Sequence, residues 1–184
     1  MENPLSPVHD VVSRHEIDLH TYADDNELYT SLNNWPPISV SPIAMMRKHD
    51  WMTTNKLKMN GKKTELLLVL PSSRRGKGNE LETIRVGSLQ VTPEECIRNL
   101  GITLDSGLSF EKHVNEVCRK AYFQIKNIAR IRRYLDINAT RTLVHAVVIS
   151  TMDYSNALLV GLPDSLIGKL QSTKAAEYKI QRLG

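Results

Sequence analysis

The sequence predicts an α+β protein, with a strand-rich part over residues 1–107 and an all-helical part over residues 108–184. In the first part, short apolar segments alternate with polar residues and end at Gly, Pro, Asn or Asp, which is typical of β-strands and turns. In the second part, apolar residues recur at every third or fourth position, which is typical of amphipathic helices. We therefore expect two consecutive regions with different architectures.

A β-hairpin is the first predicted element. The segment "IDLHTYADDNELYTSL", residues 17–32, alternates between apolar and polar residues on both sides of Asp24 and Asp25. Prolines then interrupt regular structure. Ser41 before Pro42 predicts the start of a helix that continues through "IAMMRKHDWMTTN".

Further strands and turns are predicted up to residue 107. The segment "NGKK" predicts a turn, "TELLLVL" a buried strand that ends at a proline, and "PSSRRGKGNE" a polar, basic loop. The segments "TIRVGSLQV" and "CIRNLGITLD" predict one strand each.

Three helices are predicted after residue 107. The first, "SFEKHVNEVCRKAYFQIKNIARIRRYL", begins with Ser109 as its cap and ends near Asp136, and we expect Tyr122 and Phe123 in its core. The second, "NATRTLVHAVVISTMDYSNALL", is expected to be buried over most of its circumference. Pro163 predicts the start of a third helix that reaches the C-terminus.

The composition is that of an ordinary globular protein, with 41% hydrophobic and 24% charged residues and a net charge of +4. This mild basic excess is compatible with a polyanionic partner but does not require one. Cys96 and Cys118 lie in apolar segments outside any metal-binding spacing, which favours small hydrophobic roles in a reduced protein. We see no signal peptide and no apolar run long enough for a bilayer, and therefore expect an intracellular protein, cytoplasmic or nuclear, without a membrane partner.

The adjacent carboxylates Asp24 and Asp25 allow two interpretations. At the tip of a hairpin the strands hold both side chains in place, and such carboxylates can bind Mg²⁺. Two such ions support an in-line displacement at phosphorus, but this chemistry needs a further acidic residue from another strand. The alternative is an ordinary solvated turn. His113 and His145 lie on predicted helices without metal-ligand spacing, and we expect structural roles for both.

The first long helix carries a strong excess of positive charge. Its predicted nucleic-acid-binding residues are Arg119, Lys120, Lys126, Arg130, Arg132 and Arg133. A basic helix face binds phosphate backbones without reading the base sequence. A charged helix face that only contacts solvent is the alternative.

The order of these motifs resembles the reverse transcriptase of non-LTR retrotransposons, the LINE-type elements of the jockey-like branch. The resemblance is carried by "YADD" between two strands, "WMTTNKLKMNGKKTELLL", "IRNLGITLDSGLSFEKHV", "CRKAYFQIKNIARIRRYL" and "LVHAVVISTMDYSNALLVGLP". It covers residues 5–171, and only the tail "STKAAEYKIQRLG" departs from the pattern. It implies a partial polymerase palm over residues 1–107 and a thumb-like helical region over residues 108–184.

The resemblance also assigns roles to single residues of the palm. Asp24 would be the main metal ligand and Asp25 a supporting one, while Tyr22 and Ala23 complete the box beside the incoming nucleotide or the primer end. Lys63 (or Lys62) matches a lysine near the triphosphate, where it would neutralise or protonate the leaving pyrophosphate. Without the resemblance, this lysine is a solvated charge in a turn.

A second segment of the resemblance concerns the primer. Leu100 and Gly101 in "NLGITLD" match the segment that positions the 3′ end of the primer. Judged from the residues alone, this segment is a strand in which Gly101 allows another backbone to approach closely.

The resemblance implies partners for the intact parent enzyme: an RNA template, a DNA primer, a deoxynucleoside triphosphate, and Mg²⁺ or Mn²⁺ as cofactor. The family takes a third metal-binding aspartate from an earlier strand, and no segment before Asp24 in this sequence resembles that motif or the fingers. We therefore expect a polymerase fragment that is inactive alone. The alternatives are a non-catalytic remnant that binds nucleic acid and a translated fragment without function.

Overall fold

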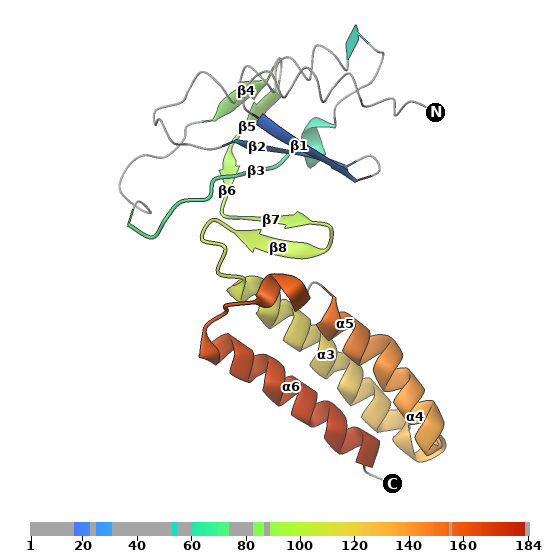
Figure 1. Cartoon of the computed structure of the whole chain (residues 1–184). Coiled ribbons are helices and arrows are strands. Elements are labelled where there is room, and N and C mark those ends of the chain that lie inside the picture. The colour runs from blue at the N-terminus through green and yellow to red at the C-terminus, as the bar shows by residue number, and fades with distance from the viewer. Residues whose placement is uncertain are drawn as a thin grey trace. The chain divides into compact units, whose positions relative to one another are not determined.

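The computed structural model describes residues 17–22, 25–30, 53–54, 60–73, 83–86, 89–154 and 156–182. The described part has a mixed α+β architecture of small two-stranded sheets and long helices (Figure 1), which confirms the predicted class. The chain forms two compact units. The first comprises residues 1–66 and 76–93, and the second residues 67–75 and 94–184.

The first unit contains the predicted hairpin. Strands β1 (Ile17–Tyr22) and β2 (Asp25–Thr30) are antiparallel, and their register runs from Ile17 opposite Thr30 to Tyr22 opposite Asp25. The predicted turn at "NGKK" is a 3-10 helix, Gly61–Lys63. The side-chain oxygen of Asn60 accepts a hydrogen bond from the backbone N–H of Lys62, which satisfies one of the free donors at the start of this helix.

Two expectations in this region are wrong. The segment "TIRVGSLQV" is not one strand but a hairpin of β4 (Ile84–Val86) and β5 (Leu89–Val91), which pair in an antiparallel manner. The segment "TELLLVL" forms only a two-residue strand, β3 (Leu66–Leu67), paired with β6 (Pro93–Glu94) and half-buried. The N–H of Leu70 donates to the carbonyl of Ser106, outside the pairing of β3 with β6.

The predicted helix after Ser41 lies outside the described residues except for Thr53 and Thr54, which are helical. Of the predicted loop over residues 71–80, the structure describes residues 71–73, which are exposed and contain a turn.

The second unit begins with another hairpin where the sequence predicted a single strand. Strands β7 (Cys96–Asn99) and β8 (Ile102–Asp105) pair in an antiparallel manner, with Asn99 opposite Ile102. Leu100 and Gly101 connect them with φ angles of 43° and 82°. A two-residue connection with two positive φ angles reverses the chain with the twist that antiparallel strands require, so the expected single strand is wrong.

Helices make up the rest of the second unit. They are α3 (Glu111–Ile131), a 3-10 turn (Arg132–Tyr134), α4 (Ile137–Val144), a π-helical segment (His145–Ile149), α5 (Ser150–Asp153), a 3-10 turn (Asn156–Leu159) and α6 (Asp164–Arg182). Figure 1 shows α3, the continuous α4–α5 segment and α6 side by side. All three predicted helices are present, but the second ends at Asp153 and not at Leu159, because Tyr154 is extended and a separate 3-10 turn follows it.

One face of each helix supplies the core of this unit. The buried core residues are Val117, Ala121, Ile125, Ile128, Val144, Val148, Met152 and Ile180, and a second cluster contains Val114, Cys118, Leu159 and Leu166. Cys118 is a small hydrophobic residue of the core, as expected. None of the helices in the described part of the chain combines the length and the apolar composition that a membrane span requires.

The second helical segment is less buried than expected. Thr140, Val144, Val148 and Met152 form a single buried stripe at spacings of four residues. The residues on the other side, including His145, are exposed. The expectation of burial over most of the circumference is therefore wrong, because α3 and α6 cover only one side of this segment.

Candidate nucleic-acid interface

The hairpin of the first unit carries Asp25 at its tip. Asp25 is the first residue of β2 and lies opposite Tyr22, which is 63% exposed. Asp25 is exposed as well. Ala23 and Asp24 lie outside the described residues.

The polar face of this hairpin extends away from its tip. Because side chains alternate along a strand, Asp25 shares a face with Glu27, His20 and Asp18. His20 lies opposite Glu27, whose carboxylate also accepts a hydrogen bond from the hydroxyl of Tyr29. His20 is exposed on the strand surface.

These side chains do not amount to a metal site. Within the described ranges, no group of three His, Cys, Asp or Glu side chains is placed to hold a metal ion. Of the predicted ligands, the described residues include one carboxylate, Asp25. Because Asp24 lies outside the described residues, the metal site at Asp24 and Asp25 stays a prediction.

Lys63 is the last residue of the 3-10 helix in the first unit, and its side chain is exposed. Its backbone N–H donates to the carbonyl of Asn60 at 3.0 Å, so the turn holds its backbone. Among the interactions of the described residues, no hydrogen bond or ion pair joins Lys63 to Asp25. The two are therefore exposed charges on separate elements.

Leu100 and Gly101 form the tip of the β7–β8 hairpin, which belongs to the second unit. The hydroxyl of Tyr154, at the end of α5, donates to the carbonyl of Leu100 at 2.5 Å. A Cβ atom at Gly101 would lie 3.4 Å from Cε1 of Tyr154. This distance is an ordinary van der Waals contact, and the three nearest atoms all belong to the Tyr154 side chain. The expected close approach of another backbone at Gly101 is therefore wrong.

Two polar contacts join this hairpin to the start of α3. The carboxylate of Asp105 accepts hydrogen bonds from the N–H groups of Gly107, Ser109 and Phe110. Burial raises the pKa of Asp105, but these bonds and one from the Ser109 hydroxyl outweigh it and hold the pKa below its usual value. The prediction of Ser109 as the helix cap is wrong, because the cap residue is Phe110, whose side chain makes no capping bond. The hydroxyl oxygen of Ser109 still accepts a hydrogen bond from the N–H of Glu111.

His113 provides the second of these contacts. It is buried, and its Nδ1 accepts a hydrogen bond from the N–H of Thr103 in β8. Burial, and to a lesser extent the charges of Lys120 and Arg98, lower its pKa despite the opposing effect of Glu116. This neutral histidine has the structural role that the sequence predicted.

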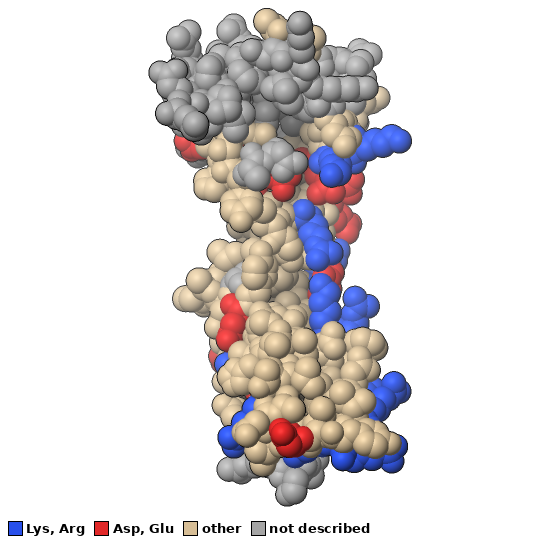
Figure 2. All heavy atoms as spheres, turned by 90° about the vertical axis from the view of Figure 1, so that its right-hand side faces the viewer, with Lys and Arg blue, Asp and Glu red and all other residues tan. Residues whose placement is uncertain are grey.

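The positive side chains of α3 and the turn after it point away from the core. We define the basic face as the exposed Arg119, Lys120, Lys126, Arg130 and Arg133. The residues from 117 to 135 include no Asp or Glu, so this face contains no acidic side chain of its own helix over that length. Figure 2 shows Lys and Arg side chains along one side of the helical region. The arrangement can bind a polyanion along the helix axis.

Arg132 differs from the other predicted cations. It is half-buried, and its guanidinium donates to the carbonyl of Leu135 at 2.8 Å. This bond satisfies a carbonyl just after the helical turn, a use typical of basic residues at helix C-termini. Arg132 therefore contributes to closing the helix end, and we leave it out of the basic face.

Two aromatic residues on α3 are exposed, contrary to expectation. Tyr122 is 45% exposed and Phe123 is 62% exposed. The helical period explains the error, because Phe123 lies three residues before Lys126 and seven before Arg130, on the polar side of the helix. Aromatic character alone had suggested a core position, whereas the spacing to the cations would have indicated the surface.

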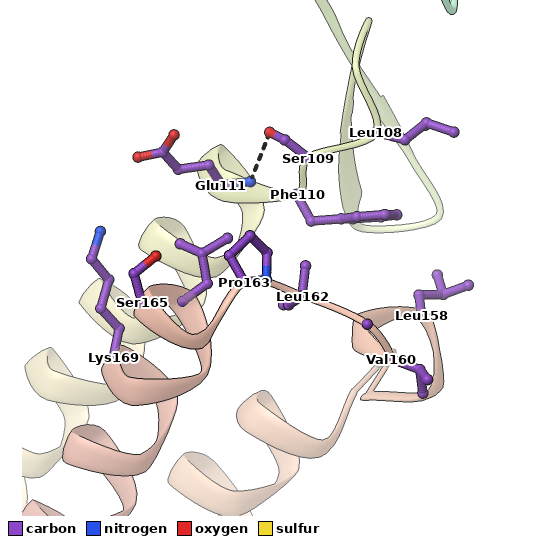
Figure 3. Close-up of a pocket in the computed structure, with 12 residues that line it drawn as sticks. Leu108, Ser109, Phe110, Glu111, Leu158, Val160, Leu162, Pro163, Ser165 and Lys169 are labelled. Atoms are coloured by element: carbon purple, nitrogen blue, oxygen red, sulfur yellow. Dashed lines mark hydrogen bonds between the residues drawn. The ribbon is translucent and has the colours of Figure 1, made fainter. Parts of the chain in front are cut away.

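The helical region also contains a pocket of about 300 Å³ between the start of α3 and the loop before α6. Figure 3 shows mostly apolar side chains around it, including Phe110 and Leu162, while Glu111 and Lys169 carry the charges among its lining residues. It contains none of the predicted site residues.

The predicted site residues are thus divided between the two units, with Tyr22, Asp25 and Lys63 in the first and Leu100, Gly101 and the basic face in the second. Comparison with protein-family models, with curated proteins and with solved structures finds no match.

Proposed function

We propose that this chain is a palm-and-thumb part of an RNA-directed DNA polymerase of the non-LTR retrotransposon type, and that its helical unit binds the RNA–DNA duplex of such an enzyme. The observation that carries the proposal is the basic face of α3. It places four exposed cations on the side of the helix opposite the core and a fifth, Arg133, in the turn after it, with no acid between residues 117 and 135.

A duplex backbone suits this face physically. Phosphate contacts release condensed counterions, so a run of exposed cations gives affinity that depends on salt and not on base sequence. A helix of this length presents its cations at regular intervals along one side. The basic face is therefore expected to position a duplex without reading its sequence.

We propose catalysis only for the intact polymerase to which this chain would belong. There, Asp24 and Asp25 would hold Mg²⁺, which supplies charge neutralisation and activation of the attacking hydroxyl. The resemblance implies a third metal-binding aspartate on another strand, and no segment of this sequence before Asp24 resembles that motif. We therefore propose that the chain alone does not extend a primer.

Binding to a labelled RNA–DNA duplex tests the proposal. The double variant Arg130→Glu, Arg133→Glu is expected to weaken binding at least tenfold, because each reversal removes one phosphate contact and adds a repulsion. The matched control is Lys179→Glu on α6, which changes an exposed lysine outside the basic face and is expected to change binding less than threefold. Equal effects of both variants would contradict a role for the basic face.

Primer extension on a homopolymer template with Mg²⁺ or Mn²⁺ tests separately whether the chain alone lacks polymerase activity. We expect incorporation at background level. Incorporation above background that disappears in Asp24→Ala would show that the chain assembles a complete metal site.

A further inference from the structure

The basic face contains an aromatic side chain at its centre. Phe123 follows Arg119 by four residues and precedes Lys126 by three, and Arg130 follows four residues later. With 3.6 residues per turn, these spacings place all four side chains on one side of α3. We call Arg119, Phe123, Lys126 and Arg130 the basic–aromatic stripe.

Phe123 is too exposed to act as a core residue. Its side chain is 62% exposed, whereas its neighbours on the opposite side of the helix, Ala121 and Ile125, are 0% and 7% exposed. The core is therefore complete without it, and the ring presents an apolar surface to solvent between positive charges. Tyr122, which is 45% exposed, extends this aromatic surface on one flank.

A duplex makes no use of such a ring. Its bases are stacked and paired in its interior, so a side chain that lies along the backbone meets only sugars and phosphates. A single strand offers both groups that the stripe can bind, since its phosphates attract the cations and its unpaired bases stack on aromatic rings.

We propose that the stripe binds single-stranded nucleic acid, with one unpaired base stacked on Phe123 and the neighbouring phosphates held by Arg119, Lys126 and Arg130. The inference rests on the proposed function, that this face binds nucleic acid, and it adds single strands to the duplex as ligands of the same cations. From Arg119 to Arg130 the helix rises about 17 Å, enough for a few nucleotides.

The 3-10 turn after α3 (Arg132–Tyr134) repeats the same combination of groups. The guanidinium carbon of Arg133 lies 4.7 Å from the centre of the Tyr134 ring, which is 74% exposed. A cation beside an exposed ring offers a strand a charge and a stacking surface at one place. The stripe therefore continues toward the end of the helix with the same chemistry.

Fluorescence anisotropy of the full chain with labelled oligo(U), labelled oligo(dT) and a labelled RNA–DNA duplex tests the inference. We expect Phe123→Ala to weaken binding of both single strands by roughly tenfold and to change duplex binding less than twofold. Phe123→Trp, which keeps a stacking surface, is expected to retain single-strand binding. The matched control is Tyr178→Ala on α6, which removes an aromatic ring of similar exposure, 61%, and should change neither affinity.

The outcomes separate this inference from the proposed function. If Phe123→Ala leaves single-strand binding unchanged, or weakens duplex and single strands equally, the stacking inference is wrong while the proposed duplex binding stands. If the wild-type chain binds none of the three ligands, the stacking inference and the proposed duplex binding are both wrong. Far-UV circular dichroism with thermal melting shows whether each variant is folded. The relative affinities of the wild-type chain for oligo(U) and oligo(dT) show whether the stripe binds RNA or DNA more tightly.

Discussion

At the scale of single residues, the turn between β7 and β8 depends on Gly101. Its φ of 82° lies in the left-handed region, and a Cβ atom would contact the Tyr154 ring at 3.4 Å. We predict that Gly101→Ala lowers the free energy of unfolding by about 1–2 kcal/mol, the usual cost of a left-handed non-glycine residue. Urea denaturation measures the change.

Leu100 is the matched control position, because it already has a positive φ of 43°. Leu100→Gly relieves this strain while adding backbone freedom to the unfolded chain. We therefore expect it to change stability less than Gly101→Ala does. An equal loss in both variants would mean that the left-handed backbone does not set the cost at Gly101.

Glu177 is a second residue with a definite energetic effect. It lies in α6 and is 2% exposed. Its burial, and to a smaller extent the charge of Asp153, raise its pKa, while the charges of His145 and Lys174 lower it by less. A raised pKa in the folded state means that stability is greatest below the unfolded pKa and falls as pH rises toward the folded value.

Replacing Glu177 by Gln removes this titration and keeps the shape of the side chain. We predict that Glu177→Gln raises the free energy of unfolding at pH 7 by on the order of 1 kcal/mol. The advantage should shrink at pH 4, where the wild-type carboxyl is protonated. Urea titrations at both pH values provide the measurement, and an advantage that grows toward pH 4 would contradict the explanation.

At the scale of elements, His113 joins α3 to β8. Because burial lowers its pKa, the neutral form belongs to the folded state, and its contribution is complete above the ordinary histidine pKa of about 6.5. We predict that the contribution of His113 to the free energy of unfolding decreases as pH falls below that value, whereas Glu177 acts in the opposite direction. His113→Gln, which keeps an acceptor without titrating, should flatten the decrease between roughly pH 7 and pH 5.

Asp105 does not interfere with that measurement. Its pKa is held below its ordinary value of 3.8, so the stability that it contributes persists above that value and is lost only as pH falls through the folded pKa. A pH dependence that survives in His113→Gln over the window from 7 to 5 would show that another group is responsible.

Helix α3 and the two missed hairpins show which elements the sequence can predict. The helix has seven buried residues at spacings of one, three and four over 21 residues, a pattern that few other structures produce. The segment "CIRNLGITLD" contains only one glycine at its centre, which is also typical of a bulge or of close backbone approach. The turn needed a positive φ at Leu100 as well, and leucine gives no signal for it.

The candidate site shows the same limit. The positions of Arg119, Lys126 and Arg130 on the surface follow directly from the helical period, and the sequence predicted them. Phe123 obeys the same period but was assigned by its apolar character. The contact between Tyr154 and Leu100 joins residues 54 positions apart, and no local pattern encodes such a contact.

At the scale of the whole molecule, the α+β class follows from the change of hydrophobic period along the chain, and the structure confirms it. The grouping of residues 94–105 with the helices does not follow from that change, because it depends on bonds between the hairpin and the helices, such as those from Thr103 to His113 and from Tyr154 to Leu100. The basic face belongs to this second unit, so its binding can be measured independently of the hairpin that carries Asp25.

The most direct test of the account is the salt dependence of duplex binding. If Arg119, Lys126, Arg130 and Arg133 each contact a phosphate, the logarithm of the association constant should fall with the logarithm of salt concentration with a slope between about −3 and −4 over roughly 50–200 mM salt. Arg130→Gln should reduce this slope by about 1, and Lys179→Gln should leave it unchanged. A slope near zero, or the same slope in wild type and Arg130→Gln, would contradict the claim that the basic face of α3 binds the phosphate backbone.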